Sequence, residues 1–369
     1  MKQSRKAVAA VALFVALTCL PCLIWPLFSA RLEGENTENR NLSELPALTL
    51  SGLSDYPAAL ENYFNDHLPF RRQLIQANSA LRYYGFASSM SDKVALGRDG
   101  WLFYTAESSP GFYNGQKRYT EEELNRIVYN MQTLKDDLEA RGTRFVLFIP
   151  PNKERMYAEY LPASFGERAD DCALFQVTAA LEERSTVRVV CPYETLIIAE
   201  GEEPDRLLYH KTDTHWNDWG AYLGVKDLLR ALYVPWDESG LRVETVPDQP
   251  GDLADMLNLA GLLDPGPTCT VSGYERADTV LQDYDFFGDI RFTCPSREAE
   301  GKLLMCRDSF CSAMAPVLGH AFSETVLTHL QAFTRDKIDL EKPDIFVLEL
   351  VERNLDFLLR DDLFLNPAE

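Results

Sequence analysis

Basic residues are scarce in this chain of 369 residues, which has 36 Lys and Arg against 57 Asp and Glu and a formal net charge of −21 at pH 7. Proteins that bind nucleic acid or an anionic membrane surface usually present a surplus of positive charge. The shortage of positive charge here argues against both classes of ligand. The sequence also lacks long repeats, low-complexity tracts and any Cys/His spacing that resembles a zinc ribbon or finger. We therefore expect a well-solvated acidic domain with no nucleic acid as a partner.

Charge is missing altogether from residues 7–28, which follow three basic residues. About twenty uncharged residues can cross a bilayer core of roughly 30 Å as a helix, and basic residues before such a span favour a cytoplasmic N-terminus. We therefore expect residues 1–30 to be an N-terminal membrane anchor that places the rest of the chain outside the cytoplasm. A cleaved signal peptide, followed by secretion, is the alternative. Residues 31–55 are polar and are expected to form a linker.

Beyond residue 30 the chain has six cysteines, which are Cys172, Cys191, Cys269, Cys294, Cys306 and Cys311. Disulfides persist in oxidising compartments, but six cysteines permit fifteen pairings and the sequence does not select among them. Cys172–Cys191 and Cys269–Cys294 are two of the pairs considered. Cys306 is expected to be a buried strand residue.

Apolar runs alternate with helical patterns from residue 120 onward. Helices are predicted over 120–141, 170–183 and 217–232, and strands over 144–149, 187–190, 302–306, 325–327 and 345–351. Strands that are apolar throughout and separated by helices are typical of a parallel sheet covered on both faces. We therefore predict the α/β class, with three layers and a mostly parallel central sheet.

Three other stretches complete the expected organisation. Two short amphipathic helices are predicted within 56–84, and a hairpin around Asp99-Gly100 is predicted within 94–104. Residues 235–300 contain six prolines and scattered glycines, and they are predicted to be an irregular, loop-rich insertion.

Two segments about ninety residues apart carry groups suited to nucleophilic catalysis. Asp213 lies two residues before His215, and Ser309 follows the predicted strand 302–306. A serine hydroxyl is a weak nucleophile near neutral pH until a base accepts its proton, and a carboxylate that orients the base completes the arrangement. We therefore predict acyl chemistry, with Ser309 as nucleophile, His215 as base and Asp213 as the group that orients His215.

Other interpretations of these residues stay open. His210, Asp213 and His215 offer three ligands within six residues, which is the number of protein ligands typical of a hydrolytic zinc centre. Structural hydrogen bonding by Asp213 and His215 is a second alternative, and Ser309 alone would often be a helix N-cap. We favour the serine mechanism, which needs neither a metal ion nor a cofactor.

Further candidates are expected near the carboxyl ends of the strands, where α/β sheets bind ligands. Asn152 and Lys153 follow one predicted strand and either form a turn or direct an amide and a cation to the site. Trp216 is either a packing residue or a platform for a sugar ring. Arg353 follows the last predicted strand and either forms an ion pair or holds the carboxylate or phosphate of a polymer.

Five motifs occur together in the order that a known group of proteins shows. They are Phe-Asn-Asp-His-Leu-Pro-Phe-Arg at 64–71, Gly-Arg-Asp-Gly-Trp-Leu-Phe-Tyr at 97–104, Pro-Pro-Asn-Lys at 150–153, Thr-Asp-Thr-His-Trp-Asn at 212–217 and Arg-Asp-Ser-Phe at 307–310. In this combination the chain resembles the SGNH-hydrolase-like proteins of the alginate O-acetyltransferase (AlgJ and AlgX) type and the related DHHW proteins. It departs from the DHHW form at Thr214, where that form has His.

The resemblance implies an SGNH-like domain over residues 56–369, with Asp213, His215 and Ser309 as its triad. The order is permuted, because ordinary SGNH hydrolases have the nucleophile first. The implied function is serine-dependent O-acyl transfer, chiefly of acetyl, to or from a cell-surface or secreted polysaccharide. A membrane-bound O-acyltransferase is a candidate partner. The alternative function is that of a non-catalytic scaffold or binding partner of such an acyltransferase.

Overall fold

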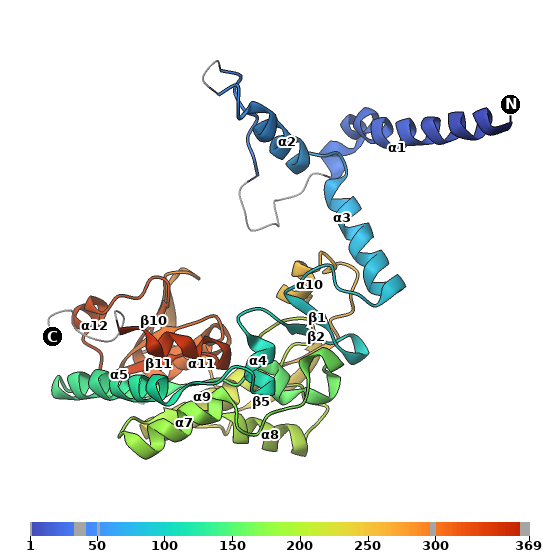
Figure 1. Cartoon of the computed structure of the whole chain (residues 1–369). Helices are drawn as coiled ribbons and strands as arrows, with labels where there is room; N and C mark the ends of the chain where they lie inside the picture. The colour runs from blue at the N-terminus through green and yellow to red at the C-terminus, as the bar shows by residue number, and fades with distance from the viewer. Residues whose placement is uncertain (1, 33–41, 50–51, 296–299, 362–369) are drawn as a thin grey trace. The chain divides into compact units, whose positions relative to one another are not determined.

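The computed structural model describes residues 2–32, 42–49, 52–295 and 300–361. The chain divides into two compact units, residues 1–86 and residues 87–369 (Figure 1). Each unit is described separately below. Part of the predicted linker, residues 33–41 and 50–51, lies outside the described residues, and residues 42–49 contain no helix or strand.

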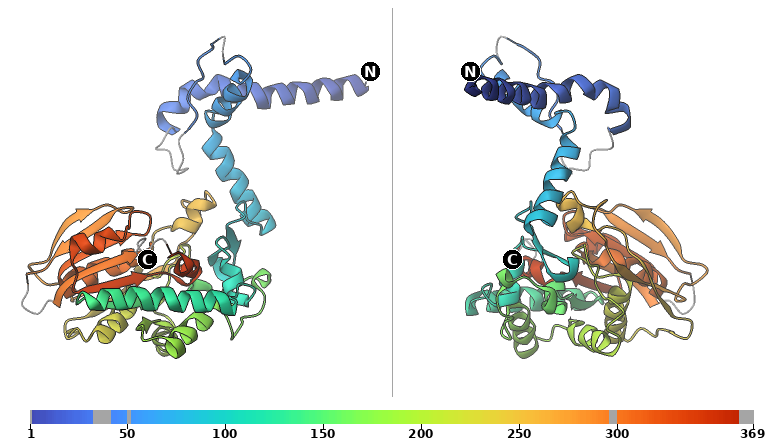
Figure 2. Two further views of the ribbon diagram at one scale, coloured as in Figure 1. Left: turned by 60° about the vertical axis from the view of Figure 1, so that its left-hand side comes forward. Right: turned by 90° about the vertical axis from the view of Figure 1, so that its right-hand side faces the viewer.

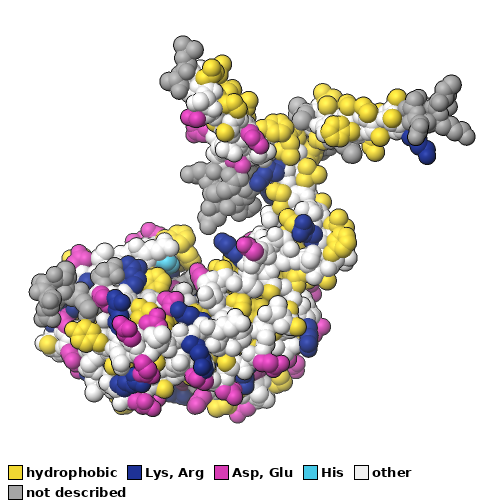
Figure 3. All heavy atoms as spheres, viewed as in Figure 1, with side chains coloured by type: hydrophobic (Ala, Val, Ile, Leu, Met, Phe, Trp, Pro, Cys, Tyr) yellow, Lys and Arg dark blue, Asp and Glu magenta, His cyan; other side chains and the backbone are white. Residues whose placement is uncertain are grey.

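The first unit is helical. It contains α1 (Lys2–Leu32), α2 (Tyr56–Asp66), α3 (Arg71–Ala80) and one π-helical turn, η1 (Leu81–Gly85), so the two helices predicted within 56–84 are confirmed. Hydrophobic side chains lie along these helices (Figure 3), and Phe14, Phe64 and Tyr84 are each more than half exposed. We expected a membrane anchor over residues 1–30. Within the described residues, no helix combines the length and the apolar character needed to cross a bilayer.

The second unit is built on a seven-stranded sheet with the order β4-β3-β11-β9-β10-β8-β7. Its strands are β3 (Arg144–Phe148), β4 (Val189–Val190), β7 (Val280–Tyr284), β8 (Asp289–Thr293), β9 (Glu300–Arg307), β10 (Phe322–His329) and β11 (Ile345–Glu349). The first five strands in this order pair in parallel, whereas β8 pairs antiparallel with both β10 and β7. The sheet is therefore mixed, with the parallel part that the sequence predicted and an antiparallel edge that it did not.

Helices cover both faces of this sheet. Successive residues of β11 point to opposite sides, so Val347 packs with α9 (Asp218–Leu232) and α11 (Cys311–Ala321), whereas Phe346 packs with α5 (Glu121–Ala140) and α7 (Ala173–Arg184). Figures 1 and 2 show α5 running alongside the strands. The three-layer α/β arrangement is thus confirmed. A capping box between Thr120 and Glu123 fixes the start of α5.

Residues 235–300 are more regular than predicted. They contain β7 and β8 and also β5 (Arg242–Pro247), α10 (Asp252–Met256) and β6 (Pro267–Ser272). β5 and β6 form a separate two-stranded antiparallel sheet in which Pro247 lies opposite Pro267 at the end of the ladder. Proline at the end of a strand removes little of the ladder, so prolines that suggested loops instead mark where strands stop and start.

The remaining elements connect these layers. The predicted hairpin is confirmed, with β1 (Val94–Leu96) paired to β2 (Leu102–Tyr104) across a turn in which Asp99 and Gly100 both have positive φ. The short helices are α4 (Ser109–Asn114), α6 (Lys153–Met156), α8 (Tyr193–Glu202), α12 (Asp336–Glu341), η2 (Arg98–Gly100), η3 (Ala158–Tyr160), η4 (Ala163–Phe165) and η5 (Glu352–Leu359).

The described cysteines are free thiols, so neither Cys172–Cys191 nor Cys269–Cys294 is bonded. Cys269 lies on β6 of the small sheet, whereas Cys294 follows β8 of the large one. Cys306 is fully buried on β9, as predicted.

Candidate active site

The turn that carries Ser309 and the segment that carries His215 meet at the carboxyl end of β9. Ser309 lies in the short turn between β9 and α11. The second segment folds back on itself, because Tyr209 and Trp216 form an antiparallel bridge and the His210 N–H donates to the His215 carbonyl at 3.2 Å. This fold-back holds Asp213 and His215 just before α9.

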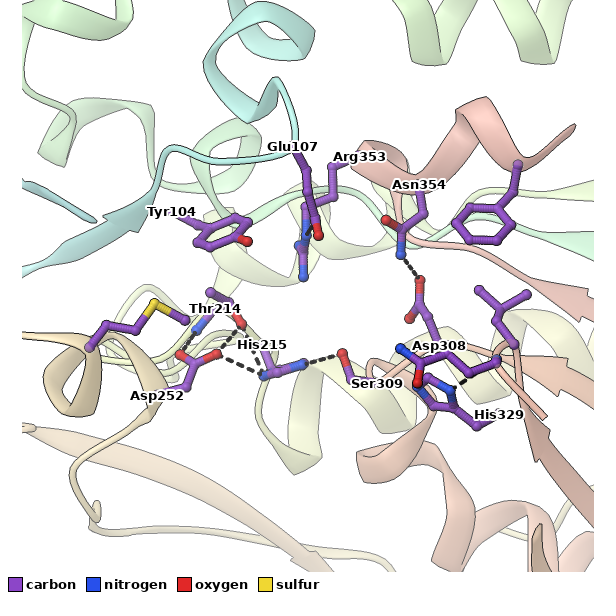
Figure 4. Close-up of a pocket in the computed structure, with 14 residues that line it drawn as sticks. Tyr104, Glu107, Thr214, His215, Asp252, Asp308, Ser309, His329, Arg353 and Asn354 are labelled. Atoms are coloured by element: carbon purple, nitrogen blue, oxygen red, sulfur yellow. Dashed lines mark hydrogen bonds and ion pairs between the residues drawn. The ribbon is translucent and has the colours of Figure 1, made fainter. Parts of the chain in front are cut away.

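Asp213, His215 and Ser309 form a continuous hydrogen-bonded chain. His215 Nε2 lies 2.8 Å from Ser309 Oγ, and His215 Nδ1 lies 2.6 Å from Asp213 Oδ1 (Figure 4 shows the His215–Ser309 contact). With the Nδ1 proton donated to Asp213, Nε2 is left to accept the proton of Ser309. The geometry suits a serine nucleophile with an oriented base.

Asp213 is held as a carboxylate. Burial opposes its ionisation, but the hydrogen bond and charge of His215 and two backbone N–H donors outweigh burial and bring the pKa of Asp213 well below its ordinary value. Those donors are the N–H groups of His215 and Asp252, at 2.9 and 2.8 Å. The sequence suggested only the contact to His215.

A second carboxylate lies beside the same imidazole and was missed in the sequence. Thr214 donates from its backbone N–H to Asp252 Oδ1 at 2.8 Å and from its hydroxyl to Asp252 Oδ2 at 2.7 Å. Its hydroxyl oxygen is also 3.1 Å from His215 Nδ1. Burial and the negative charge of Asp213 raise the pKa of Asp252. The stretch around Asp252 was predicted to be irregular, so nothing in the sequence placed it at the site.

Gly251 allows α10 to approach this loop closely. A Cβ atom at Gly251 would lie 2.3 Å from Asp213 Cβ and 2.6 Å from Asp213 Oδ2. Real Cβ atoms do not come so close to other atoms, so only glycine fits here without displacing Asp213. Its φ of −96° is ordinary for any residue, and the constraint is therefore the contact and not the backbone conformation.

Lys153 is buried beneath the loop that carries Asp213 and His215, and its side chain does not border the cavities of the site. Its side chain is buried, and Nζ donates to the carbonyls of Asp213, His210 and Lys211 at 2.5, 3.2 and 3.4 Å. The ammonium also lies over the rings of two hairpin residues, Trp101 and Phe103. Of the two roles left open for Lys153, these contacts favour the structural one, because its donors are directed into the protein.

Trp216 and Asn152 are also buried, with 0% and 1% of their surface exposed. Trp216 Nε1 donates to the Phe310 carbonyl at 2.9 Å, which ties the His215 segment to the Ser309 turn. Asn152 Oδ1 lies 3.4 Å from Arg353 Nη1. Trp216 borders the smaller of the two cavities described below, whereas Asn152 borders neither. Because Trp216 has no exposed surface, it serves as a packing residue.

A buried ion pair joins the carboxyl ends of β3 and β11. Arg155 follows β3 and Glu352 follows β11, and Arg155 Nε lies 3.1 and 3.0 Å from the two carboxylate oxygens of Glu352. Both side chains are almost fully buried. Glu352 also accepts the backbone N–H of Asn152 at 3.0 Å, so one carboxylate fixes the loop after each strand.

Asp308 orders the turn that holds Ser309. Its carboxylate accepts N–H groups from Phe310, Val351 and Asn354 at 2.9, 2.8 and 2.7 Å. Burial and the nearby charge of Asp308 raise the pKa of Glu349, at the end of β11, well above its ordinary value. These contacts place Ser309 directly before α11, whose N-terminal end favours negative charge.

Two cavities meet at the His215–Ser309 pair. One, of about 300 Å³, is bordered by His215 and Ser309 together with Tyr104, Glu107, Asp252, His329, Arg353, Asn354 and others. The second, of about 250 Å³, is bordered by His215 and Ser309 together with Trp216, Phe286, Phe310, Ser312 and Ala313 among others. In Figure 4, Tyr104, Glu107 and Arg353 face His215 and Ser309 across the first cavity.

The residues that could bind a metal ion in the structure differ from the three that the sequence suggested. His210 is bonded to Asp248, with Nδ1 2.7 Å from Oδ2. Among the described residues, the group that could hold an ion is Asp213, His215 and Asp252. All four carboxylate oxygens of that group already accept N–H or O–H donors of the protein. Asp213 is thus engaged by His215 and a backbone N–H, and Asp252 by Thr214.

A helix-covered α/β sheet, a serine after one strand and an Asp-x-His loop together define an SGNH-hydrolase-like protein. The family described as SGNH hydrolase-like domain, acetyltransferase AlgX, matches residues 94–289, which is more than half of the chain, so the chain belongs to that family. The family predicted from the motifs is confirmed.

Individual relatives agree with this family. The probable alginate O-acetylase AlgJ of Pseudomonas syringae pv. tomato is 29% identical over 178 residues, which cover 47% of this chain and 42% of that one. The chain thus spans less than half of that relative's length. Bacillus cereus PatB1 has a TM-score of 0.54 at 16% identity, over 72% of this chain and 97% of that one. A DHHW family protein from Eubacterium siraeum has a TM-score of 0.53 at 15% identity, over 73% and 94%. These two likenesses concern the fold.

Proposed function

We propose that this protein transfers O-acetyl groups to, or removes them from, a polysaccharide outside the cytoplasm, through an acetyl ester on Ser309. The observation that carries the proposal is the hydrogen-bonded chain from Asp213 through His215 to Ser309 beside two cavities. The name of the relative, probable alginate O-acetylase, supports acetyl as the group and a polysaccharide as the acceptor.

In the first half-reaction, Ser309 Oγ attacks the carbonyl carbon of an acetyl donor. His215 Nε2 takes the hydroxyl proton, and Asp213 stabilises the imidazolium that results. The tetrahedral oxyanion forms at the N-terminal end of α11, where backbone N–H groups around Ser309 and the helix dipole stabilise it. The bond between the carbonyl carbon and the leaving group then breaks, and His215 returns the proton to the leaving group.

In the second half-reaction the acceptor replaces the donor. A sugar hydroxyl, or water, loses its proton to His215 Nε2 and attacks the acetyl carbon. The ester bond to Ser309 Oγ breaks, and Ser309 regains a proton from His215. Transfer to the sugar gives a transferase, and transfer to water gives an esterase. A carboxylate-paired imidazole supports both outcomes.

Location and partners follow from the same proposal. The uncharged stretch of residues 7–28 after basic residues is suited to export of the rest of the chain. A membrane-bound O-acyltransferase is the proposed source of acetyl groups. Protease added to spheroplasts, from which any outer membrane has been removed, should digest the second unit. Protection of that unit until the cells are lysed would contradict an extracytoplasmic location.

The activity is tested with a chromogenic acetyl ester. Slow turnover is expected, and Ser309→Ala and His215→Ala should each lower kcat by about a thousandfold or more. Asp213→Asn should lower it by at least about a hundredfold. Circular dichroism and Tm of each variant are the controls for folding. Turnover by Ser309→Ala at the wild-type rate would exclude this mechanism, whereas no turnover by the wild-type protein would favour a non-catalytic scaffold of the acyltransferase.

A further inference from the structure

The charges around the larger cavity indicate which acceptor it suits. The ionisable side chains on its border are the carboxylates of Glu107, Asp252 and Asp308, the guanidinium of Arg353 and the imidazoles of His215 and His329. Among the described residues that border the cavity, Arg353 carries the sole Lys or Arg side chain. Burial and the charge of Arg307 lower the pKa of His329, so His329 is neutral near pH 7. The border is therefore net negative.

Arg353 is not available as an independent clamp for a carboxylate. Its Nε lies 3.2 Å from Glu107 Oε2, and its guanidinium lies over the rings of Tyr104 and Phe310. The side chain is only 9% exposed, whereas that of Glu107 is 52% exposed. An acidic ligand in the cavity would be repelled by the Glu107 carboxylate. It could pair with Arg353 only after it had displaced Glu107 from the guanidinium.

Asp252 adds a second negative charge, which interacts with the buried ammonium of Lys153 and lies 3.9 Å from His215 Nδ1. Its carboxylate is 33% exposed and accepts donors from Thr214. Asp213, also a carboxylate, lies directly behind it and faces the smaller cavity. A carboxylate on every sugar ring would be repelled from both sides of the Ser309–His215 pair. At the effective dielectric of a protein surface, each such repulsion weakens binding by a factor on the order of ten.

The same groups are good partners for hydroxyls. Carboxylate oxygens accept O–H hydrogen bonds, the amides of Asn354 and Gln331 both donate and accept, and Tyr104 and Phe357 offer ring surfaces to the apolar face of a sugar. The charge of the chain as a whole, −21, acts in the same direction, because it does not attract an anionic polymer.

On the basis of the proposed function, we propose that the acceptor of this site is a hydroxyl-rich glycan without acidic groups, held in the cavity between Arg353 and Ser309. The site would thus differ in substrate from a relative named for alginate, whose sugars each carry a carboxylate. Glu107 and Asp252 are the residues that exclude the acidic polymer.

A matched pair of acceptors tests this directly. β-1,4-linked mannotetraose and mannuronate tetramer differ only in a hydroxymethyl group or a carboxylate on each ring. With a chromogenic acetyl ester as donor, kcat/KM for acetylation of mannotetraose should exceed that for the mannuronate tetramer by about tenfold or more. The ratio should shrink as salt is raised, because salt screens the repulsion.

Glu107→Gln should raise kcat/KM for the mannuronate tetramer by about three- to tenfold, because it removes one negative charge and releases Arg353. Glu182→Gln is the matched control, since Glu182 is an exposed α7 residue outside the cavity border, and it should leave the selectivity ratio within twofold. Binding of both tetramers to Ser309→Ala, measured by calorimetry, tests selectivity without turnover. Tighter binding of mannotetraose supports the proposal even where the acyl-transfer mechanism fails. Preference for the mannuronate tetramer, weakened by salt and unchanged in Glu107→Gln, would overturn it.

Discussion

Lys153 is an ammonium group buried beneath the loop that carries Asp213. Burial lowers its pKa to about 8, although the charges of Asp213 and Asp252 partly oppose this. Below that pH the charged group donates to three loop carbonyls. Above it the amine has only two N–H donors, so one carbonyl loses its partner. We expect kcat/KM for ester hydrolysis to fall by about two- to tenfold between pH 7.5 and about 9.5 as the loop loosens, measured after subtraction of the spontaneous rate.

The contribution of Lys153 to the free energy of unfolding should not fall with pH as kcat/KM does. The folded-state pKa of Lys153 lies below its ordinary value of 10.5, so the unfolded chain holds the proton to higher pH. The contribution of Lys153 to stability therefore increases as the pH rises from about 8 to 10.5. Lys153→Met should be less active at neutral pH and should lack this alkaline decline. The same decline in the variant, or unfolding of the wild type in parallel with the loss of activity, would contradict this role.

The hydrogen bonds at His215 also predict how the protein responds to chelators. His215 Nδ1 is bonded to Asp213 and Nε2 to Ser309, so a serine mechanism needs no ion at these atoms. Ester hydrolysis should stay within twofold of its starting rate after dialysis against EDTA. A stoichiometric metal that survives dialysis, with activity lost on its removal, would instead point to a metal-dependent deacetylase.

Single residues differ in how well the sequence predicts them. The contact between His215 and Ser309 was predictable because their motifs combine a base, its carboxylate and a nucleophile after a strand. The roles of Lys153 and Trp216 stayed open in the sequence, because the direction of a side chain at the end of a strand depends on what packs against it. Asp252 was missed since its contact with Thr214 joins residues 38 apart in the sequence.

At the scale of elements, the fit between α10 and the Asp213 loop depends on Gly251. Gly251→Ala places a methyl group 2.3 Å from Asp213 Cβ, which forces the carboxylate away from His215. We expect kcat for ester hydrolysis to fall by about tenfold or more, with a loss of stability of about 1–3 kcal/mol typical of overpacking. Gly261→Ala is the control, because a Cβ atom there meets nothing within 4 Å. Equal activity of the two variants would show that the fit of α10 is not needed.

The ion pair between Arg155 and Glu352 connects two strand ends and should be important for stability. Glu352→Gln leaves the guanidinium of Arg155 buried without a counter-charge, which typically costs about 3–5 kcal/mol. By contrast, Asp171→Asn removes one partner of the exposed Arg118–Asp171 pair and should cost about 0–1 kcal/mol. Urea denaturation measures both. A loss below about 1 kcal/mol for Glu352→Gln would contradict the role given to this pair.

The elements of the parallel half of the sheet were predictable, because each strand contains an apolar run and two of the long helices have a clear start. Thr120 and Asn217, for example, cap α5 and α9 with their side chains. The antiparallel edge was not predictable in the same way. β7 is exposed along its whole length, so it lacks the buried apolar pattern by which the other strands were recognised.

For the whole molecule, the second unit contains every residue that we propose for catalysis and selectivity. Acidic and basic side chains are interspersed on the face of this unit seen in Figure 3. The cavity differs from this face in that Glu107, Asp252 and Asp308 all border it. Composition predicted the acidic character of the chain, but the local excess at the cavity arises from the fold, which brings Glu107 and Asp252 to the same space.

The central claim is that Ser309 carries the acetyl group. It is tested most directly by mixing the protein with excess chromogenic acetyl ester, quenching in acid within the first turnover and locating the added acetyl mass by peptide mass spectrometry. Wild-type protein should carry the acetyl group on Ser309, with a burst of chromophore close to one equivalent, and His215→Ala should show neither. Hydrolysis of the ester with no acetyl group on Ser309, or with the same burst in Ser309→Ala, would contradict the account.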